Sequence, residues 1–212
     1  LTTPDGGIDM AKALTKQILA AVKYLHSSLN IVHRDLKPDN ILLQPVNEGN
    51  DRSSGGVPCI KIADFGLSTF FESTRMMKEQ CGTPAYTAPE VQCGAGYSRA
   101  VDLWAVGAML YYMLSLRMPF HITKADRRHL REKTATVEEV YPSCLEFGSI
   151  SCPVVQDLIR RLLRLEPLER YSAIEAAQHE WITGVQVEHR PSVMEMLRDH
   201  DYSLLESQES GA

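Results

Sequence analysis

The longest regular pattern of apolar positions runs from residue 8 to the neighbourhood of Ser28. Apolar side chains recur there every three or four residues, at Ile8, Ala11, Leu14, Ile18, Val22 and Leu25. Because this spacing places them on one face of an α-helix, we predict a long helix that ends near Ser28. Residues 1–7 contain Pro and Gly and predict a loop before it.

Two later helices are predicted, one apolar on all sides and one with a single apolar face. Residues 101–115 are apolar on all sides, which indicates a buried central helix; the run 103–114 is too short to cross a membrane. A second helical face is formed by Val155, Leu158, Ile159, Leu162 and Leu163. Helix starts are indicated by the capping boxes that begin at Thr136 and Ser172.

Two short apolar runs, residues 41–43 and 59–62, have the length of strands. Residues 44–58 between them contain three Gly, two Pro and two Ser, which predicts a flexible connection. We interpret this connection as a tolerated surface insertion, with a partner-binding loop as the alternative. The chain as a whole is therefore expected to be mainly α with a short β-hairpin.

Composition and charge narrow the classes of protein. The 212 residues are enough for one domain, and 44% apolar with 23% charged residues is typical of globular proteins. A net charge of −5 argues against nucleic-acid binding. No apolar run reaches the roughly 18 residues of a membrane span. Five scattered cysteines without a CxxC motif indicate reduced thiols, and no signal peptide is visible in these residues, so we expect an intracellular, cytoplasmic or nuclear, protein.

The segment His-Arg-Asp-Leu-Lys-Pro-Asp-Asn at residues 33–40 concentrates the candidate chemistry. It places Asp35, Lys37 and Asn40 within six residues, and Asp64 follows in Asp-Phe-Gly. Phosphoryl transfer needs an acid to accept a hydroxyl proton and a cation to offset phosphate charge. It also needs oxygen ligands for Mg²⁺, which Asn40 and Asp64 can supply.

These motifs resemble the C-terminal lobe of a eukaryotic Ser/Thr protein kinase over roughly residues 8–183. His33-Arg34-Asp35 with Asn40, Asp-Phe-Gly at 64–66, Ala-Pro-Glu at 88–90, Asp-Leu-Trp-Ala-Val-Gly at 102–107 and Arg170 occur in the family's order. Five motifs in order are far more specific than any one of them. Residues 81–84 and 97–104 look most like the calcium/calmodulin-dependent group.

The resemblance implies roles for individual residues. Asp35 is the expected general base for a Ser or Thr hydroxyl of a protein substrate, and Lys37 is expected to reach the transferring phosphate. Asn40 and Asp64 are the expected Mg²⁺ ligands, and Leu42 resembles the residue beneath the adenine of ATP. His33 is expected to stack under Phe65 as a packing residue and the other six histidines to be surface or packing residues.

The resemblance also implies contacts that support the site. Asp102 is expected to bond the backbone of the catalytic loop, and Thr83 to bond Asp35 or Lys37. Glu90 and Arg170 are expected to form a buried ion pair.

Glu79 stands two residues before Cys-Gly-Thr, where many related kinases carry a phosphorylated residue. A carboxylate there can pair permanently with Arg34; a solvated Glu79 is the alternative.

The family's N-terminal lobe, with its Gly-rich loop and strand lysine, has no counterpart in these residues. We therefore expect residues 1–183 to be a partial kinase domain with the N-lobe absent, and the isolated chain to have little activity. A non-catalytic scaffold or binding module is the alternative function.

Residues 185–212, with six acids against two arginines and a net charge of −4, predict an acidic, mostly flexible tail from residue 184 onward. The tail lacks the basic amphipathic pattern of a calmodulin target.

Overall fold

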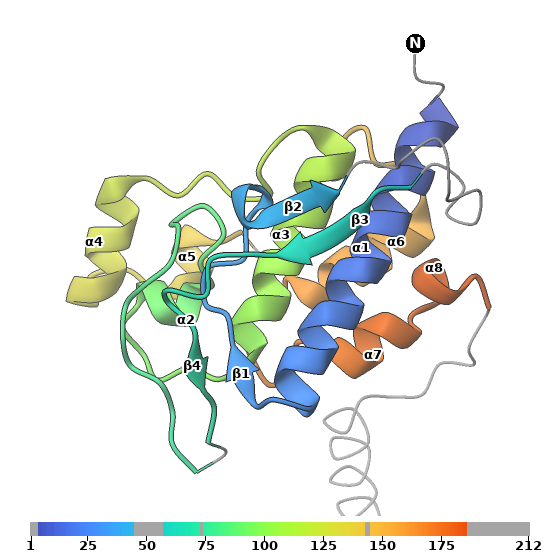
Figure 1. Cartoon of the computed structure of the whole chain (residues 1–212). Helices are drawn as coiled ribbons and strands as arrows, with labels where there is room; N and C mark the ends of the chain where they lie inside the picture. Colours follow the sequence, from blue (N-terminus) through green and yellow to red (C-terminus); the bar gives the residue numbers. More distant parts are fainter. Residues whose placement is uncertain (1–3, 45–56, 73, 143–144, 186–212) are drawn as a thin grey trace, which may run out of the picture.

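The computed structural model describes residues 4–44, 57–72, 74–142 and 145–185, and the structural statements below concern those residues. It is rich in helix, with two small sheets (Figure 1). The helices are α1 (Pro4–Ser27), α2 (Pro89–Gln92), α3 (Ala100–Ser115), α4 (Lys124–Glu132), α5 (Val137–Val140), α6 (Pro153–Leu162), α7 (Ala173–Gln178) and α8 (Glu180–Thr183). The strands are β1 (Ile31–Val32), β2 (Ile41–Gln44), β3 (Cys59–Ile62) and β4 (Thr69–Phe70).

Helix α1 confirms the predicted long helix but begins earlier than expected. The predicted loop over residues 1–7 is wrong from Pro4 onward, because the first helical turn does not need the backbone N–H that Pro lacks. Ala11, Ile18, Val22 and Leu25 of the apolar face are buried, Leu14 is half-buried, and Ile8 is 38% exposed. This face packs against α3 and α7.

Helix α3 is the centre of the hydrophobic core, as its apolar character on all sides predicts. Every residue from Val101 to Tyr111 is buried. Gly107 allows α6 to approach closely, since a Cβ atom there would lie 2.8 Å from the Cβ of Leu162. The predicted helical face of α6 is also confirmed, and all five of its apolar residues are buried.

The two predicted strands form an antiparallel hairpin, in which Ile41 pairs with Ile62. Gln17 fixes this hairpin to α1, because its Nε2 donates to Pro58 O and its Oε1 accepts from Ile60 N, both at 3.0 Å. A second pair, β1 with β4, joins Val32 to Thr69. The pairs therefore hold the His33–Asn40 loop and the residues around Asp64 at neighbouring strand ends.

The capping boxes predicted at Thr136 and Ser172 are confirmed, and a third begins α4 at Thr123. In the part of the chain that the structure describes, no helix has the length and apolar character needed to span a membrane. The described cysteines, at positions 59, 81, 93 and 152, are free thiols. Most of the 44–58 connection and residues 186–212 of the predicted tail lie outside the described residues.

Candidate active site

Asp102 on α3 orders the backbone of the His33–Asn40 loop from inside the core. Its carboxylate is 1% exposed and accepts hydrogen bonds from the backbone N–H groups of His33 and Arg34, each at 2.9 Å. The contact implied by the resemblance is therefore present. The ring of His26 adds a third contact, with Nε2 2.7 Å from Asp102 Oδ2. His26 is a hydrogen-bonding partner of this loop support, a role that no spacing in the sequence reveals.

His33 is a buried packing residue, as expected. Its ring meets Phe65 edge-on, with centroids 5.0 Å apart and planes at 64°, where stacking was expected. The reason is a hydrogen-bonding contact of 3.0 Å between His33 Nε2 and Ala63 O, which turns the ring toward the backbone.

Asp35 is the most heavily hydrogen-bonded side chain of the loop. Its Oδ1 accepts from the N–H of Thr83 at 2.8 Å and from the Thr83 hydroxyl at 2.7 Å. Its Oδ2 accepts from Lys37 Nζ at 2.8 Å and from Asn40 Nδ2 at 3.3 Å. Lys37 also donates to Thr83 Oγ1 at 2.8 Å, so Thr83 contacts both residues named as alternatives.

The electrostatics of Asp35 favour an ionised carboxylate. Burial alone raises its pKa, but the hydrogen bonds from Lys37 and Thr83 outweigh burial and hold the pKa below its ordinary value. The hydrogen bond to Asp35 in turn raises the pKa of Lys37. At neutral pH the two groups are therefore a carboxylate and an ammonium ion in direct contact.

Asn40 and Asp64 are brought together through Ala63, the residue directly before Asp64. Asn40 Nδ2 donates to Asp35 O at 2.8 Å, and Asn40 O accepts from Ala63 N at 2.9 Å, directly before Asp64. Asp64 is exposed and has a left-handed backbone with φ of 58°, which is uncommon outside glycine. Gly66 N donates to its Oδ1 at 3.2 Å.

These oxygens suit a magnesium ion. No donor among the described residues bonds Asn40 Oδ1, and Asp64 has a second, exposed carboxylate oxygen. The described residues contain no cluster of three or more His, Cys, Asp or Glu side chains that could hold a metal. A site with two protein oxygens fits Mg²⁺, which usually keeps water and substrate phosphates as its other ligands.

Leu42 lies beside this group on β2, opposite Lys61, and is 53% exposed. An apolar ligand group can therefore reach it. The catalytic and ligand-binding roles of all five residues stay predictions.

Arg34 connects the loop to the segment that follows Asp64. Its Nη1 donates to Glu79 Oε2 at 2.8 Å and to the Tyr97 hydroxyl at 3.2 Å. Tyr97 donates to Glu79 O at 2.6 Å, and burial raises its pKa to about 12, which keeps it a neutral donor. The predicted Arg34–Glu79 pair is thus present, and Tyr97 is a partner that the sequence did not indicate.

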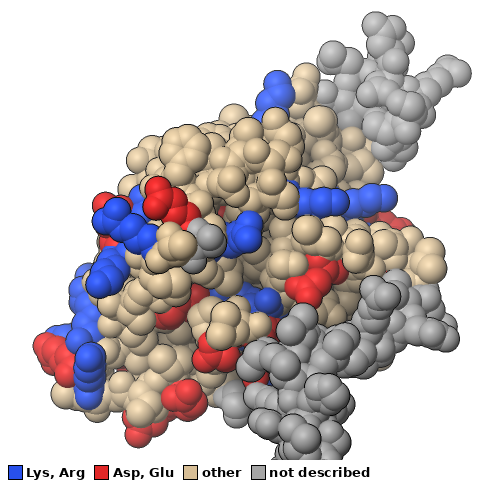
Figure 2. Space-filling view, turned by 90° about the horizontal axis from the view of Figure 1, so that it is seen from below, with Lys and Arg blue, Asp and Glu red and all other residues tan. Residues whose placement is uncertain are grey.

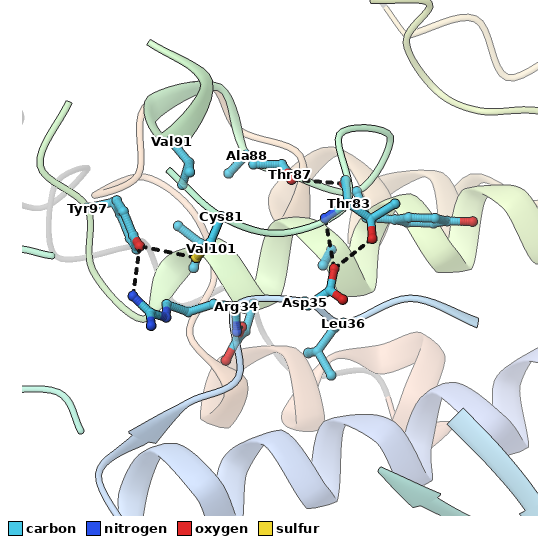
Figure 3. A pocket seen from close by; sticks show the side chains of 13 residues that line it. Arg34, Asp35, Leu36, Cys81, Thr83, Thr87, Ala88, Val91, Tyr97 and Val101 are labelled. Atoms are coloured by element: carbon cyan, nitrogen blue, oxygen red, sulfur yellow. Dashed lines mark hydrogen bonds between the residues drawn. The ribbon is translucent and has the colours of Figure 1, made fainter. Parts of the chain in front are cut away.

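Figure 3 shows how these groups surround one small space between the loop and the later segment. Arg34, Tyr97 and Cys81 lie on one side of it, and Asp35 and Thr83 lie on the other. The cavity measures about 10 Å³, close to the room that one water molecule needs. The His33–Asn40 loop and the later segment are therefore packed closely together at the candidate site.

The predicted ion pair between Glu90 and Arg170 is present and buried. Its two N–O distances are 2.8 and 3.2 Å, and the Arg170 side chain is 0% exposed. Arg170 also donates to Ala100 O and Arg164 O and lies over the ring of Trp104. The pair ties the end of the Asp64–Glu90 segment to α3.

Comparison with known proteins gives a consistent assignment. Residues 7–182 match the protein kinase domain. The chain is 40% identical over 176 residues to human calcium/calmodulin-dependent protein kinase type IV, covering 83% of this chain and 34% of that protein. It is 39% identical over 186 residues to the DNA damage response protein kinase DUN1 of Saccharomyces cerevisiae, covering 84% and 36%.

A third relative is the probable serine/threonine-protein kinase fhkD of Dictyostelium discoideum. It is 38% identical over 182 residues, covering 81% of this chain and 23% of that protein. The chain thus spans between about a quarter and about a third of the length of these three relatives.

Proposed function

The chain belongs to the protein kinase domain family, and we propose that it is the catalytic part of a serine/threonine kinase acting on proteins. It transfers the γ-phosphoryl group of ATP to Ser or Thr hydroxyls. The observation that carries this proposal is the hydrogen-bonded group of Asp35, Lys37 and Thr83, with Asn40 and Asp64 joined beside it through Ala63. The Dictyostelium relative, named as a probable serine/threonine-protein kinase, supports the same class of acceptor.

In this proposal Asp35 orients the acceptor hydroxyl and accepts its proton as the oxygen attacks phosphorus. Its lowered pKa supports the role, since the carboxylate is ionised when the hydroxyl arrives. Lys37 lies within 2.8 Å of both Asp35 and Thr83, where an ammonium ion offsets charge on the transferring phosphate. Thr83 and Pro84 stand in a segment that resembles the family's substrate loop, and they receive the substrate residue that follows the acceptor.

Asn40 and Asp64 would hold Mg²⁺, and Leu42 would lie beneath the adenine of ATP. The metal ion, when bound, neutralises charge on the phosphates. The left-handed backbone at Asp64 supports this role, because strained conformations outside glycine persist where the surrounding structure fixes them and are frequent at functional sites.

The Arg34–Glu79 pair supports a further part of the proposal. A phosphate on this segment orders it in many kinases by pairing with the Arg of His-Arg-Asp. Here Glu79 already makes that charge-assisted hydrogen bond. The segment is therefore ordered without phosphorylation at this position.

We assign the chain to the calcium/calmodulin-dependent group, based on residues 81–84 and 97–104 and on the similarity to the human type IV kinase. Calmodulin itself is not proposed as a partner.

The 212 residues contain no Gly-rich phosphate loop followed by a strand lysine, which the reaction requires. We propose that they transfer little phosphate alone and need an N-terminal lobe that supplies both.

The test uses a fusion that places the chain behind the region preceding the match in the human type IV kinase, and compares it with the chain alone and with the Asp35→Asn variant of the fusion. With ATP, Mg²⁺ and a Ser peptide, the fusion is expected to transfer phosphate at least about a hundredfold faster than its Asp35→Asn variant, the loss typical of removing a general base. Thermal unfolding confirms that both fusions are folded. A folded fusion as slow as its variant would favour the non-catalytic binding module.

A further inference from the structure

Helix α4 carries an unusual concentration of positive charge for this chain. Residues 121–133 contain five Lys and Arg side chains against two acids, a net charge of +3 in a chain of net −5. The five are Lys124, Arg127, Arg128, Arg131 and Lys133. Blue side chains gather along the left edge of Figure 2, the side on which α4 lies in Figure 1.

These cations have no acidic partners within the molecule as described. None of the five is within 4.0 Å of a carboxylate in the described residues. Their helix is nevertheless held firmly, by the capping box between Thr123 and Asp126 and by Leu130, which is 2% exposed. Lys124, Arg128, Arg131 and Lys133 are exposed, whereas Arg127 is half-buried and donates to Ile122 O at 2.9 Å. Four of the five charges are therefore presented to solvent on a fixed element.

A cavity connects α4 to the candidate active site. It measures about 390 Å³, and its lining includes Thr83, Pro84 and Ala85 together with Ile122 and Arg127. Thr83 bonds Asp35 directly. A peptide whose acceptor lies at Asp35 and whose next residues pass Thr83 and Pro84 is therefore led toward the cations of α4.

We propose that α4 binds acidic side chains of the protein substrate that follow the phosphorylated Ser or Thr. The positive charge of α4 complements acidic side chains, and the cavity lined by Thr83 and Pro84 also reaches Arg127 of this helix. Screening makes the local charge decisive, because the Debye length is about 10 Å at 0.1 M salt and the negative charge of the rest of the chain is largely screened. The inference rests on the proposed function, which supplies the position and direction of the substrate.

The test is fluorescence polarisation of labelled Ser peptides with the 212-residue chain at about 0.1 M salt, where the charge of the rest of the chain is screened. One peptide has glutamates after the acceptor, a second has the same glutamates before it, and a third has glutamines in their place. The first peptide is expected to bind about tenfold more tightly than the third, as a few solvent-exposed ion pairs can give, and this advantage falls as salt is added.

Two charge-reversal variants separate α4 from net charge. Arg128→Glu with Arg131→Glu alters exposed cations of α4, and Lys16→Glu with Lys23→Glu alters exposed cations of α1 by the same amount. The α4 variant is expected to lose the advantage of the first peptide, while the α1 variant keeps it. Circular dichroism shows that both variants are folded.

The proposal is overturned if the first and third peptides bind equally or not at all. It is also overturned if glutamates before the acceptor serve as well, or if both variants behave alike. Failure of the proposed kinase function gives a different result, in which the α4-dependent preference remains while the fusion described above transfers no phosphate.

Discussion

At the scale of single residues, Arg34 links the parts of the candidate site. Its backbone N–H donates to Asp102, and its φ of 68° places it in the left-handed region. Its guanidinium group donates to Leu67 O at 2.6 Å and to the Glu79 carboxylate at 2.8 Å. One residue thus connects α3, the loop that holds Asp35 and the segment that follows Asp64.

Reversing the charge of Glu79 tests the contribution of this connection to activity. In the fusion, Glu79→Arg is expected to lower the rate of phosphate transfer about three- to tenfold, since an exposed ion pair contributes about 0.2–1 kcal/mol and reversal adds repulsion. Glu79→Gln, which keeps a hydrogen-bond acceptor, is expected to lose less. An unchanged rate for Glu79→Arg, measured with a saturating peptide, would mean that Glu79 is simply solvated.

Gly82 lets the later segment approach the loop. Its φ is +95°, and a Cβ atom there would lie 2.6 Å from Arg34 O. Gly82→Ala is expected to lower the free energy of unfolding by about 1–3 kcal/mol and to disturb the Thr83–Asp35 contacts. Gly184→Ala is the matched control, because Gly184 also has a positive φ, +72°, but open space around it.

Urea unfolding of the two alanine variants separates the close approach from backbone strain alone. The cost at Gly82 should exceed the cost at Gly184, since only Gly82 has a backbone atom in the way. Equal costs would contradict a tight contact between the segment and the loop.

Site residues that stand in local motifs could be predicted from the sequence. Residues that approach the site only when the chain folds could not. Asp35, Lys37, Asn40 and Asp64 stand in short motifs, so their proximity follows from chain order and two strand pairs. Tyr97 and His26 lie 63 and 76 positions from their partners Arg34 and Asp102. Tyr and His at such separations have many possible environments, and nothing local selects one.

At the scale of elements, the anchoring of the Asp64–Glu90 segment to α3 depends on Arg170. Arg170→Ala leaves Glu90 as a buried, unpaired carboxylate and is expected to cost about 3–5 kcal/mol. Replacing both partners, with Glu90→Leu and Arg170→Met, is expected to restore part of the loss because no charge remains buried. Calorimetry measures both, and an unshifted melting temperature for Arg170→Ala would contradict the buried pair.

Helices with periodic apolar faces were predictable, and elements without such faces were not. Helices α1 and α6 bury regular sets of side chains, so spacing alone located them, and α3 was located by its apolar residues on all sides. Helix α4 buries only Leu130, and its capping box uses Asp126 in place of the usual Glu or Gln. Strands β1 and β4 have two residues each, too few for any periodicity to register.

At the scale of the whole molecule, the carboxylates with lowered pKa values predict loss of stability in acid. Burial alone raises the pKa of Asp35, but the hydrogen bonds from Lys37 and Thr83 lower it below 3.8. A carboxylate whose folded pKa is lowered stabilises the fold above its unfolded pKa, and this contribution is lost as pH falls through the folded value. The free energy of unfolding should therefore decrease below about pH 4.

Urea titrations from neutral pH into acid measure this dependence. The Asp35→Asn variant is expected to show a shallower acid decrease than the unaltered chain, since one of the linked carboxylates is gone. Asp9→Asn, at an exposed position of α1, is the matched control and should retain the full decrease. An unchanged slope for Asp35→Asn would show that its hydrogen bonds do not lower its pKa.

The extent of the kinase-like region could be predicted from the sequence, because the family's motifs occur in order from His33 to Arg170. The predicted match over roughly residues 8–183 agrees with the matched residues 7–182. The division into a domain at residues 1–183 and a tail at 184–212 stays a prediction. The composition of residues 184–212 indicates only their general character, since no periodic pattern or motif there predicts a contact with the rest of the chain.

The central claim is that Asp35, Asn40 and Asp64 surround one pocket for a metal ion and a nucleotide. Mn²⁺, a paramagnetic ion that accepts the same oxygen ligands as Mg²⁺, tests it when added with ADP to the isotope-labelled chain. The amide signals of these three residues should broaden before those of α6, α7 and α8, and Asp64→Ala with Asn40→Ala should abolish the effect. Broadening centred elsewhere, or unchanged in the double variant, would contradict the claim.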